Sequence, residues 1–212
     1  MVQLGDEVPD FEADTTKGKI RFHEWLADCW GILFSHPKDY TPVCTTELAE
    51  VARLQSEFEQ RSTKVIGLSV DDVAEHLRWE SDIEELRGHP VNFPMIGDGD
   101  RKVATLYGMI HSSALDNLTV RSVFVIDPEK RLRLEMTYPA SVGRNFVEIL
   151  RVLDSLQLTD SFPIATPANW HPGNQVILSN SVSDDEGRRR FVGLRELKPY
   201  LRLVDDPRTQ TT

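Results

Sequence analysis

The chain is poor in cysteine, in positive charge and in long apolar runs, and each shortage excludes a class of protein. Its 212 residues include only two cysteines, too few for a disulfide framework and typical of a reducing compartment. The 34 acidic residues outnumber the 24 basic ones, and a net charge of −10 argues against nucleic-acid binding. No apolar run reaches the length of a membrane span, and residues 1–7 lack the features of a secretory signal. We therefore expect a cytoplasmic protein without a membrane span.

Patterns that bind metals or cofactors are also missing. The sequence has no Cys-x-x-Cys, which counts against a disulfide oxidoreductase. His171 has no second histidine or cysteine at ligand spacing. We expect neither a metal ion nor another cofactor.

Short apolar segments alternate with amphipathic ones in the first part of the chain. We predict strands at 30–34 and 65–70, helices at about 44–60 and 73–86, a hairpin over 120–136, and a long helix at 145–156. This order indicates an α/β domain with a mixed central sheet flanked by helices. The strand at 30–34 would deliver the loop at 37–44 to the carboxyl edge of the sheet, where α/β proteins place their sites.

Composition changes after Leu158. Prolines recur through the rest of the chain, and a charged run lies at 184–190. We interpret the acidic start of that run, at 184–186, as a solvated turn. We expect a main domain at 1–158 and a C-terminal extension at 159–212. The extension looks too poor in apolar residues to fold alone, so we expect it to lie on the main domain or on a partner subunit.

Cys44 is the strongest candidate for chemistry. It lies between turn and cap residues, just before a helical pattern. A thiol in the first turn of a helix meets unpaired backbone N–H groups and the positive end of the helix dipole, and both favour the reactive thiolate. The alternative is a buried, inert cysteine.

Two further side chains could serve that thiolate. Thr41 is three residues earlier, and its hydroxyl could donate to the sulfur or act as a plain N-cap. Arg121 opens an apolar strand and could supply a fixed cation, although spacing alone favours a solvated strand end. Arg144, before the long helix, is a weaker candidate of the same kind.

The run His36-Pro-Lys-Asp-Tyr-Thr-Pro-Val-Cys-Thr-Thr-Glu47 resembles the active-site loop of the peroxiredoxins, thiol peroxidases with a thioredoxin-like fold. The resemblance extends through 120–128, 138–140, 143–146 and 165–170, and so covers about residues 4–205. Since residues 160–212 contain no cysteine, the subtype resembled is the 1-Cys group, also described as non-selenium glutathione peroxidase.

The resemblance implies a role for each site residue. Cys44 would be the peroxidatic nucleophile, Thr41 would hydrogen-bond the peroxide and sulfur, and Arg121 would hold the thiolate and polarise the O–O bond. Four supporting roles are also implied. Pro37 would shield the pocket from water, and His36 would border it. Glu47 would orient the arginine, and Arg144 would be the second arginine of the network. The expected substrates are hydrogen peroxide and organic hydroperoxides, the expected product is a sulfenic acid, and the expected reductant is an external thiol such as glutathione. The expected assembly is a homodimer.

Cys29 leaves one alternative activity open. We interpret it as a structural thiol near the sheet edge, and a resolving role would need its Cα within about 7 Å of that of Cys44. Some relatives of the resembled type are described as phospholipases A2 that use a serine, a histidine and an aspartate. His23 matches the histidine, but Cys29 replaces the serine and Glu129 the aspartate. An acyl hydrolase therefore stays an alternative, as does a redox sensor in which oxidation of Cys44 changes a partner interface.

Overall fold

The computed structural model describes residues 2–114 and 117–209, and the chain divides into two compact units, Met1–Phe146 and Val147–Thr212. The expected domain boundary was residue 158. The division by contacts instead assigns nearly all of the long helix α6 (Phe146–Ser161) to the second unit.

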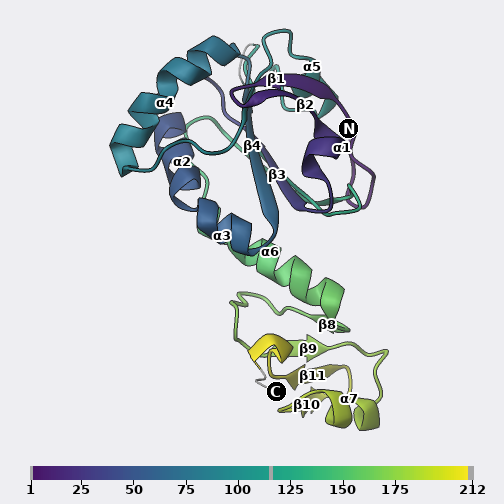
Figure 1. Ribbon diagram of the computed structural model, residues 1–212. Helices are drawn as coiled ribbons and strands as arrows, with labels where there is room; N and C mark the ends of the chain where they lie inside the picture. The colour runs from purple at the N-terminus through teal and green to yellow at the C-terminus, as the bar shows by residue number, and fades with distance from the viewer. Residues whose placement is uncertain (1, 115–116, 210–212) are drawn as a thin grey trace. The chain divides into compact units, whose positions relative to one another are not determined.

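The first unit contains a seven-stranded sheet with helices on both faces (Figure 1). Its elements are β1 (Glu12–Thr15), β2 (Gly18–Arg21), α1 (Phe22–Leu26), β3 (Trp30–Ser35), α2 (Pro42–Arg53), α3 (Gln55–Gln60), β4 (Thr63–Ser69), α4 (Val73–Arg87), β5 (Met95–Gly97), α5 (Lys102–Leu106), β6 (Arg121–Ile126) and β7 (Leu132–Tyr138). The strand order is β2-β1-β5-β4-β3-β6-β7. Strands β3, β4 and β5 run parallel, whereas β6 is antiparallel to both β3 and β7. The predicted mixed sheet, its two central strands and the hairpin at β6–β7 are confirmed.

Helix boundaries follow from local chemistry. Asp72 caps α4, since its side chain accepts a hydrogen bond from the backbone N–H of Glu75, and Gly88 ends the helix in the left-handed conformation with φ of 70°. Helix α2 begins at Pro42, whose missing N–H is not needed at the first helical position.

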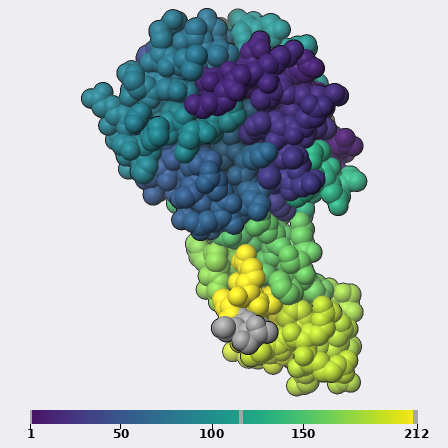
Figure 2. Space-filling view, in the orientation of Figure 1, coloured from purple at the N-terminus to yellow at the C-terminus, as the bar shows by residue number. Residues whose placement is uncertain are grey.

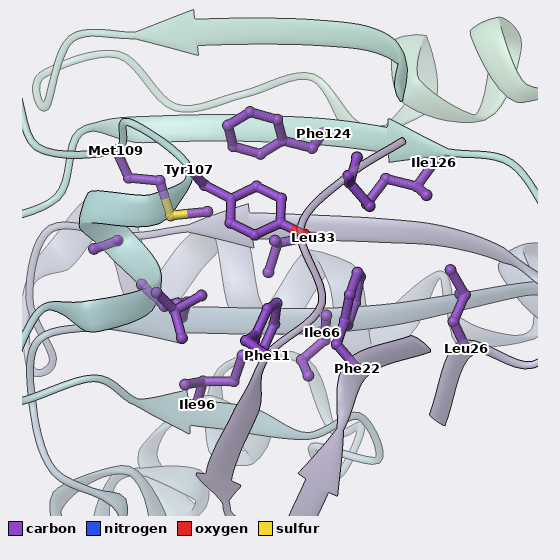
Figure 3. Packing of buried hydrophobic residues seen from close by; sticks show 14 of the residues in the cluster. Phe11, Phe22, Leu26, Leu33, Ile66, Ile96, Tyr107, Met109, Phe124 and Ile126 are labelled. Carbon is purple, nitrogen blue, oxygen red and sulfur yellow. The ribbon is translucent and has the colours of Figure 1, made fainter. Parts of the chain in front are cut away.

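One face of the sheet is covered by α1 and α5, and an aromatic cluster fills the space between (Figure 3). Phe11 stacks on Phe22 with ring centroids 4.7 Å apart, and Tyr107 meets Phe124 edge-on at 5.4 Å. The buried Tyr107 hydroxyl donates to the carbonyl of Pro9 at 2.7 Å, which satisfies its only polar atom. Helices α2 and α4 cover the opposite face, so both faces of the sheet are covered by helices (Figure 1).

The second unit has a core of its own. After α6 it contains β8 (Ile164–Ala165), β9 (Val176–Leu178), α7 (Asp184–Arg190), β10 (Arg195–Lys198), β11 (Leu201–Val204) and the short 3₁₀ helix Pro207–Thr209. The strands form a sheet of order β10-β11-β9-β8. Its buried cluster consists of Leu158, Ile164, Trp170, Val176, Leu178, Val182, Phe191 and Val204. The few apolar residues of this segment converge around Trp170, and the expectation that the segment does not fold alone stays a prediction.

The acidic residues at 184–186 also differ from expectation, because they open helix α7 and do not form a turn. Ser183 caps that helix through the backbone N–H of Glu186. In Figure 2 the yellow atoms near the C-terminal end of the described chain lie on the surface of the second unit, and the purple atoms of the N-terminal part lie on the surface of the first. None of the helices that the structure describes is both long and apolar enough to cross a bilayer.

Candidate active site

Cys44 lies in the first turn of α2, at the third helical position after the N-cap residue Thr41. The backbone at Thr41 is extended, with φ of −113° and ψ of 145°, so the chain turns into the helix there. The thiol is fully buried, but it belongs to the helix end, where backbone N–H groups and the helix dipole favour an anion.

The sheet topology places Arg121 beside this thiol. Because β6 runs antiparallel to β3, the start of β6 lies next to the end of β3, and α2 follows β3 after a short loop. Arg121 Nη1 donates to Cys44 Sγ at 3.3 Å and to Glu47 Oε2 at 2.6 Å. Its Nε and Nη2 both donate to the carbonyl of Ala140, at 2.9 and 2.7 Å. The guanidinium is buried, so the solvated strand end that spacing favoured is wrong.

Glu47 connects both arginines. Its Oε1 accepts from the backbone N–H and from Nε of Arg144, and its Oε2 accepts from Nη2 of Arg144 as well as from Arg121. Arg144 Nη1 also donates to the carbonyls of Ser35 and Ser122, at 2.8 and 2.9 Å. Burial alone would raise the pKa of Glu47, but the charge and hydrogen bonds of Arg144, with the charge of Arg121, outweigh it and hold the pKa below 4.5. Glu47 is therefore ionised at neutral pH.

The charge count of this cluster favours a thiolate. Two buried guanidinium groups and one buried carboxylate leave a surplus of one positive charge, and a buried charge without a partner is costly. An anion at Cys44 Sγ balances it, and Arg121 Nη1 already points a hydrogen at that sulfur. The arrangement is that of an activated nucleophile with a fixed hydrogen-bond donor beside it.

The remaining predicted residues lie in the loop between β3 and α2. Pro37 is buried, and its role as a shield from water stays a prediction. The hydroxyl of Thr41 donates to the carbonyl of Lys38 at 2.9 Å, while its carbonyl accepts from the N–H and the hydroxyl of Thr45. Thr41 therefore occupies the N-cap position, but its side chain accepts no hydrogen bond from the helix. Its one hydroxyl proton is directed at the carbonyl of Lys38 and not at the sulfur of Cys44.

His36 belongs to a buried network that the sequence did not reveal. Asp39 lies between two histidines, with Oδ1 2.7 Å from His36 Nε2 and Oδ2 2.6 Å from His76 Nδ1. His76 comes from α4, and its Nε2 lies 3.0 Å from the carbonyl of Ile96 in β5. The spacing of His36 and Asp39 was visible within the loop motif, but nothing local in the sequence pairs Asp39 with a histidine 37 residues later.

The arrangement needed for acyl hydrolysis is not formed among the described residues. His23 Nε2 lies 2.9 Å from the carbonyl of Val8, Glu129 pairs with Arg131, and no hydrogen bond links Cys29 to His23 or Glu129. Cys29 instead lines a cavity of about 370 Å³ with Trp25, Lys64 and Phe93, and both cysteines are free thiols.

A thioredoxin-like sheet that presents a thiol at a helix start, beside an arginine held by a carboxylate, defines a cysteine-based peroxidase. The comparisons with known proteins agree. Residues 4–135 match the AhpC/TSA family, and residues 155–193 match the C-terminal domain of 1-Cys peroxiredoxin. The chain belongs to the 1-Cys peroxiredoxins of the AhpC/TSA family, and it is a thiol-dependent peroxidase.

Individual relatives cover nearly the whole chain. It is 51% identical over 207 residues to a 1-Cys peroxiredoxin of Dictyostelium discoideum, covering 97% of this chain and 86% of that protein. It is 48% identical to peroxiredoxin-6 of Mus musculus, covering 96% of this chain and 97% of the relative. A cysteine-to-serine variant of peroxiredoxin 6 from Arenicola marina has a similar structure, with a TM-score of 0.93, 44% identity, and coverage of 99% of this chain and 100% of the other. The resemblance predicted from the active-site run is thereby confirmed.

Proposed function

We propose that Cys44 is the peroxidatic nucleophile, that it reduces hydrogen peroxide and organic hydroperoxides, and that it is converted to a sulfenic acid. The observation that carries this proposal is the 3.3 Å hydrogen bond from Arg121 Nη1 to Cys44 Sγ within a cluster that has one positive charge in surplus. The thiolate attacks one peroxide oxygen and forms an S–O bond, and the O–O bond breaks. The departing oxygen leaves as hydroxide or alkoxide and takes up a proton to become water or an alcohol.

Arg121 is proposed to serve both the sulfur and the departing oxygen. Negative charge moves from the sulfur to that oxygen during the reaction, and a donor that is already fixed needs no reorganisation. One such donor is typically worth about 3 kcal/mol of barrier, or roughly a hundredfold in rate. Glu47, Arg144 and the carbonyl of Ala140 are proposed to hold the guanidinium in place, and Thr41 is proposed to turn its hydroxyl to the peroxide when the substrate binds.

A small thiol such as glutathione is the proposed reductant. Two thiols are needed per cycle: the first displaces water from the sulfenic acid to form a mixed disulfide, and the second releases Cys44 and leaves with the first as a disulfide. A related 1-Cys peroxiredoxin from yeast mitochondria, with a TM-score of 0.89 and 49% identity, is described as resolved via glutathione/thioredoxin systems.

A homodimer is proposed as the assembly, and a cytoplasmic location stays a prediction. Strands β2 and β7 end the sheet of the first unit, and β10 and β8 end that of the second. A terminal strand can pair with a strand of a second copy. Sedimentation at micromolar concentration should show twice the chain mass, and a monomer would contradict the proposal.

Intact-mass analysis after one equivalent of hydrogen peroxide tests the chemistry. The wild-type chain and the matched control Cys29→Ser should both gain one oxygen atom that a sulfenic-acid reagent traps, whereas Cys44→Ser should gain none. A loss of two hydrogens in the wild type would show an internal disulfide and overturn the 1-Cys mechanism. A redox sensor, the second candidate, should stop after one equivalent when an excess of thiol and peroxide is supplied, whereas an enzyme should cycle many times.

A further inference from the structure

His76 lies between two groups that can only accept hydrogen bonds. Its Nδ1 is 2.6 Å from Asp39 Oδ2, its Nε2 is 3.0 Å from the carbonyl of Ile96, and the side chain is fully buried. A carboxylate and a carbonyl have no proton to give, so both ring nitrogens must donate. The geometry therefore requires an imidazolium, which forms a buried ion pair with Asp39.

His36 has the opposite state. Its Nε2 donates to Asp39 Oδ1 at 2.7 Å, and its Nδ1 is buried without a hydrogen-bond partner among the described residues. Burial lowers the pKa of His36 below 6.5 despite the hydrogen bond that the ring donates to Asp39, so the ring is neutral. His36 is thus held as the tautomer that carries its proton on Nε2, and Nδ1 keeps an unused lone pair in a dry environment.

We propose that His76 is a positioning residue for the peroxidase reaction: its imidazolium fixes Asp39, and Asp39 fixes both the loop that leads into the Cys44 helix and the tautomer of His36. The proposal deepens the proposed function and rests on it. Asp39 lies midway between the last residue of β3 and the first residue of α2. Its backbone N–H also donates to Asp71 Oδ2 at 2.9 Å, so the loop is tied to the start of α4 from both its main chain and its side chain.

The distances favour this network over a metal site. His36, Asp39 and His76 could share an ion, since their donor atoms all lie within 4.8 Å of one another. Two ligand atoms at tetrahedral zinc distances lie about 3.3 Å apart. The observed 2.6 and 2.7 Å separations between nitrogen and oxygen are instead those of charge-assisted hydrogen bonds.

The ion pair confines the ordered loop to a window of pH. Burial opposes both charges, but the paired histidines lower the pKa of Asp39 to about 2, and Asp39, the Ile96 carbonyl and Asp71 raise the pKa of His76 above 6.5. The stability contributed by Asp39 is complete above its ordinary value of 3.8 and is lost as pH falls toward 2. The stability contributed by His76 is complete below 6.5 and is lost as pH rises through the raised value. Asp71, in the turn between β4 and α4, and His36 face the ion pair of Asp39 and His76. The charge of Arg144 acts on His36 and lowers its pKa.

Nitrogen-15 NMR of the histidine rings in the full-length protein tests the protonation states directly, whatever the activity. At pH 7 we expect both ring nitrogens of His76 to be protonated, and only Nε2 of His36. A His76 ring with one bare nitrogen would overturn the proposal. Stoichiometric binding of added Zn²⁺ that shifts the signals of both rings would overturn it too, because the site would then be a metal site.

Kinetics of Cys44 oxidation test the positioning role. His76→Gln should lower the second-order rate with hydrogen peroxide by roughly ten- to hundredfold, as expected for a misplaced site. It should also remove the alkaline fall in rate that we expect of the wild type. The matched control His89→Gln alters an exposed histidine and should leave both unchanged. A folded His76→Gln protein with the wild-type rate and pH profile would refute the role, and if that variant does not fold, the ring protonation states decide. A wild type that does not react with peroxide would instead mean that the proposed function has failed.

Discussion

Replacement of Glu47 by glutamine tests how the arginine cluster is held together. The carboxylate accepts four hydrogen bonds, two at each oxygen, and all four donors belong to Arg121 or Arg144. A glutamine amide keeps only one oxygen. If that oxygen takes the position of Oε1, the new NH₂ group faces Arg121 Nη1 and Arg144 Nη2, two cationic donors that it cannot satisfy.

The expected loss follows from this count. Two charge-assisted hydrogen bonds are broken, each worth about 1.5–3 kcal/mol, and a buried positive charge is left without its carboxylate. Removal of one partner from a buried ion pair typically costs about 3–5 kcal/mol, so we expect a loss of this size in the free energy of unfolding. Oxidation of Cys44 should also slow, because Arg121 would lose its anchor beside the sulfur.

Glu50→Gln is the matched control, because Glu50 is on the same helix and pairs with Arg53 in partly exposed surroundings. That change should cost less than about 1 kcal/mol. Urea unfolding followed by tryptophan fluorescence gives the stabilities, and stopped-flow oxidation gives the rates. If Glu47→Gln lost no more stability than Glu50→Gln and kept the wild-type oxidation rate, the argument from buried charge would be wrong.

Two further changes probe the donor and the core. Arg121→Lys keeps the positive charge, but the lysine ammonium cannot reach the Cys44 sulfur and the Ala140 carbonyl at once. Peroxide should therefore oxidise Cys44 roughly a hundredfold more slowly in stopped-flow experiments. An unchanged rate would show that the forked guanidinium of Arg121 is not needed. Tyr107→Phe removes the buried hydrogen bond to the Pro9 carbonyl and should cost about 1 kcal/mol in urea unfolding. Tyr200→Phe, at a side chain that is 69% exposed, should change stability by much less, and equal losses would refute the argument.

The sequence predicted the parts of the fold that local patterns determine. The short apolar segments predicted β3 and β4, the amphipathic pattern at 73–86 predicted α4, and the hairpin predicted over 120–136 is that of β6 and β7. The core of the second unit could not be predicted, because its apolar residues are separated in the sequence by prolines and polar turns. They come together around Trp170 only in the folded chain.

The candidate site also has one part that local sequence patterns predict and another that they do not. Cys44 could be placed at a helix start because Pro42 and the threonines mark that start. The burial of Arg121 could not be derived from its neighbours, because it depends on the antiparallel register of β6 against β3. The pairing of Asp39 with His76 depends in turn on how α4 packs over the loop, and no periodicity in the sequence reports that contact.

The complete burial of Cys44 has a consequence for the second half of the reaction cycle. Hydrogen peroxide needs little room at this buried sulfur, whereas a bulky thiol needs more, so we expect such a thiol to approach only when part of the first turn of α2 moves. We therefore expect regeneration by bulky thiols to depend on fraying of that turn. Bulky reductants should reach a common ceiling velocity, set by how often the helix end opens and not by their own nucleophilicity.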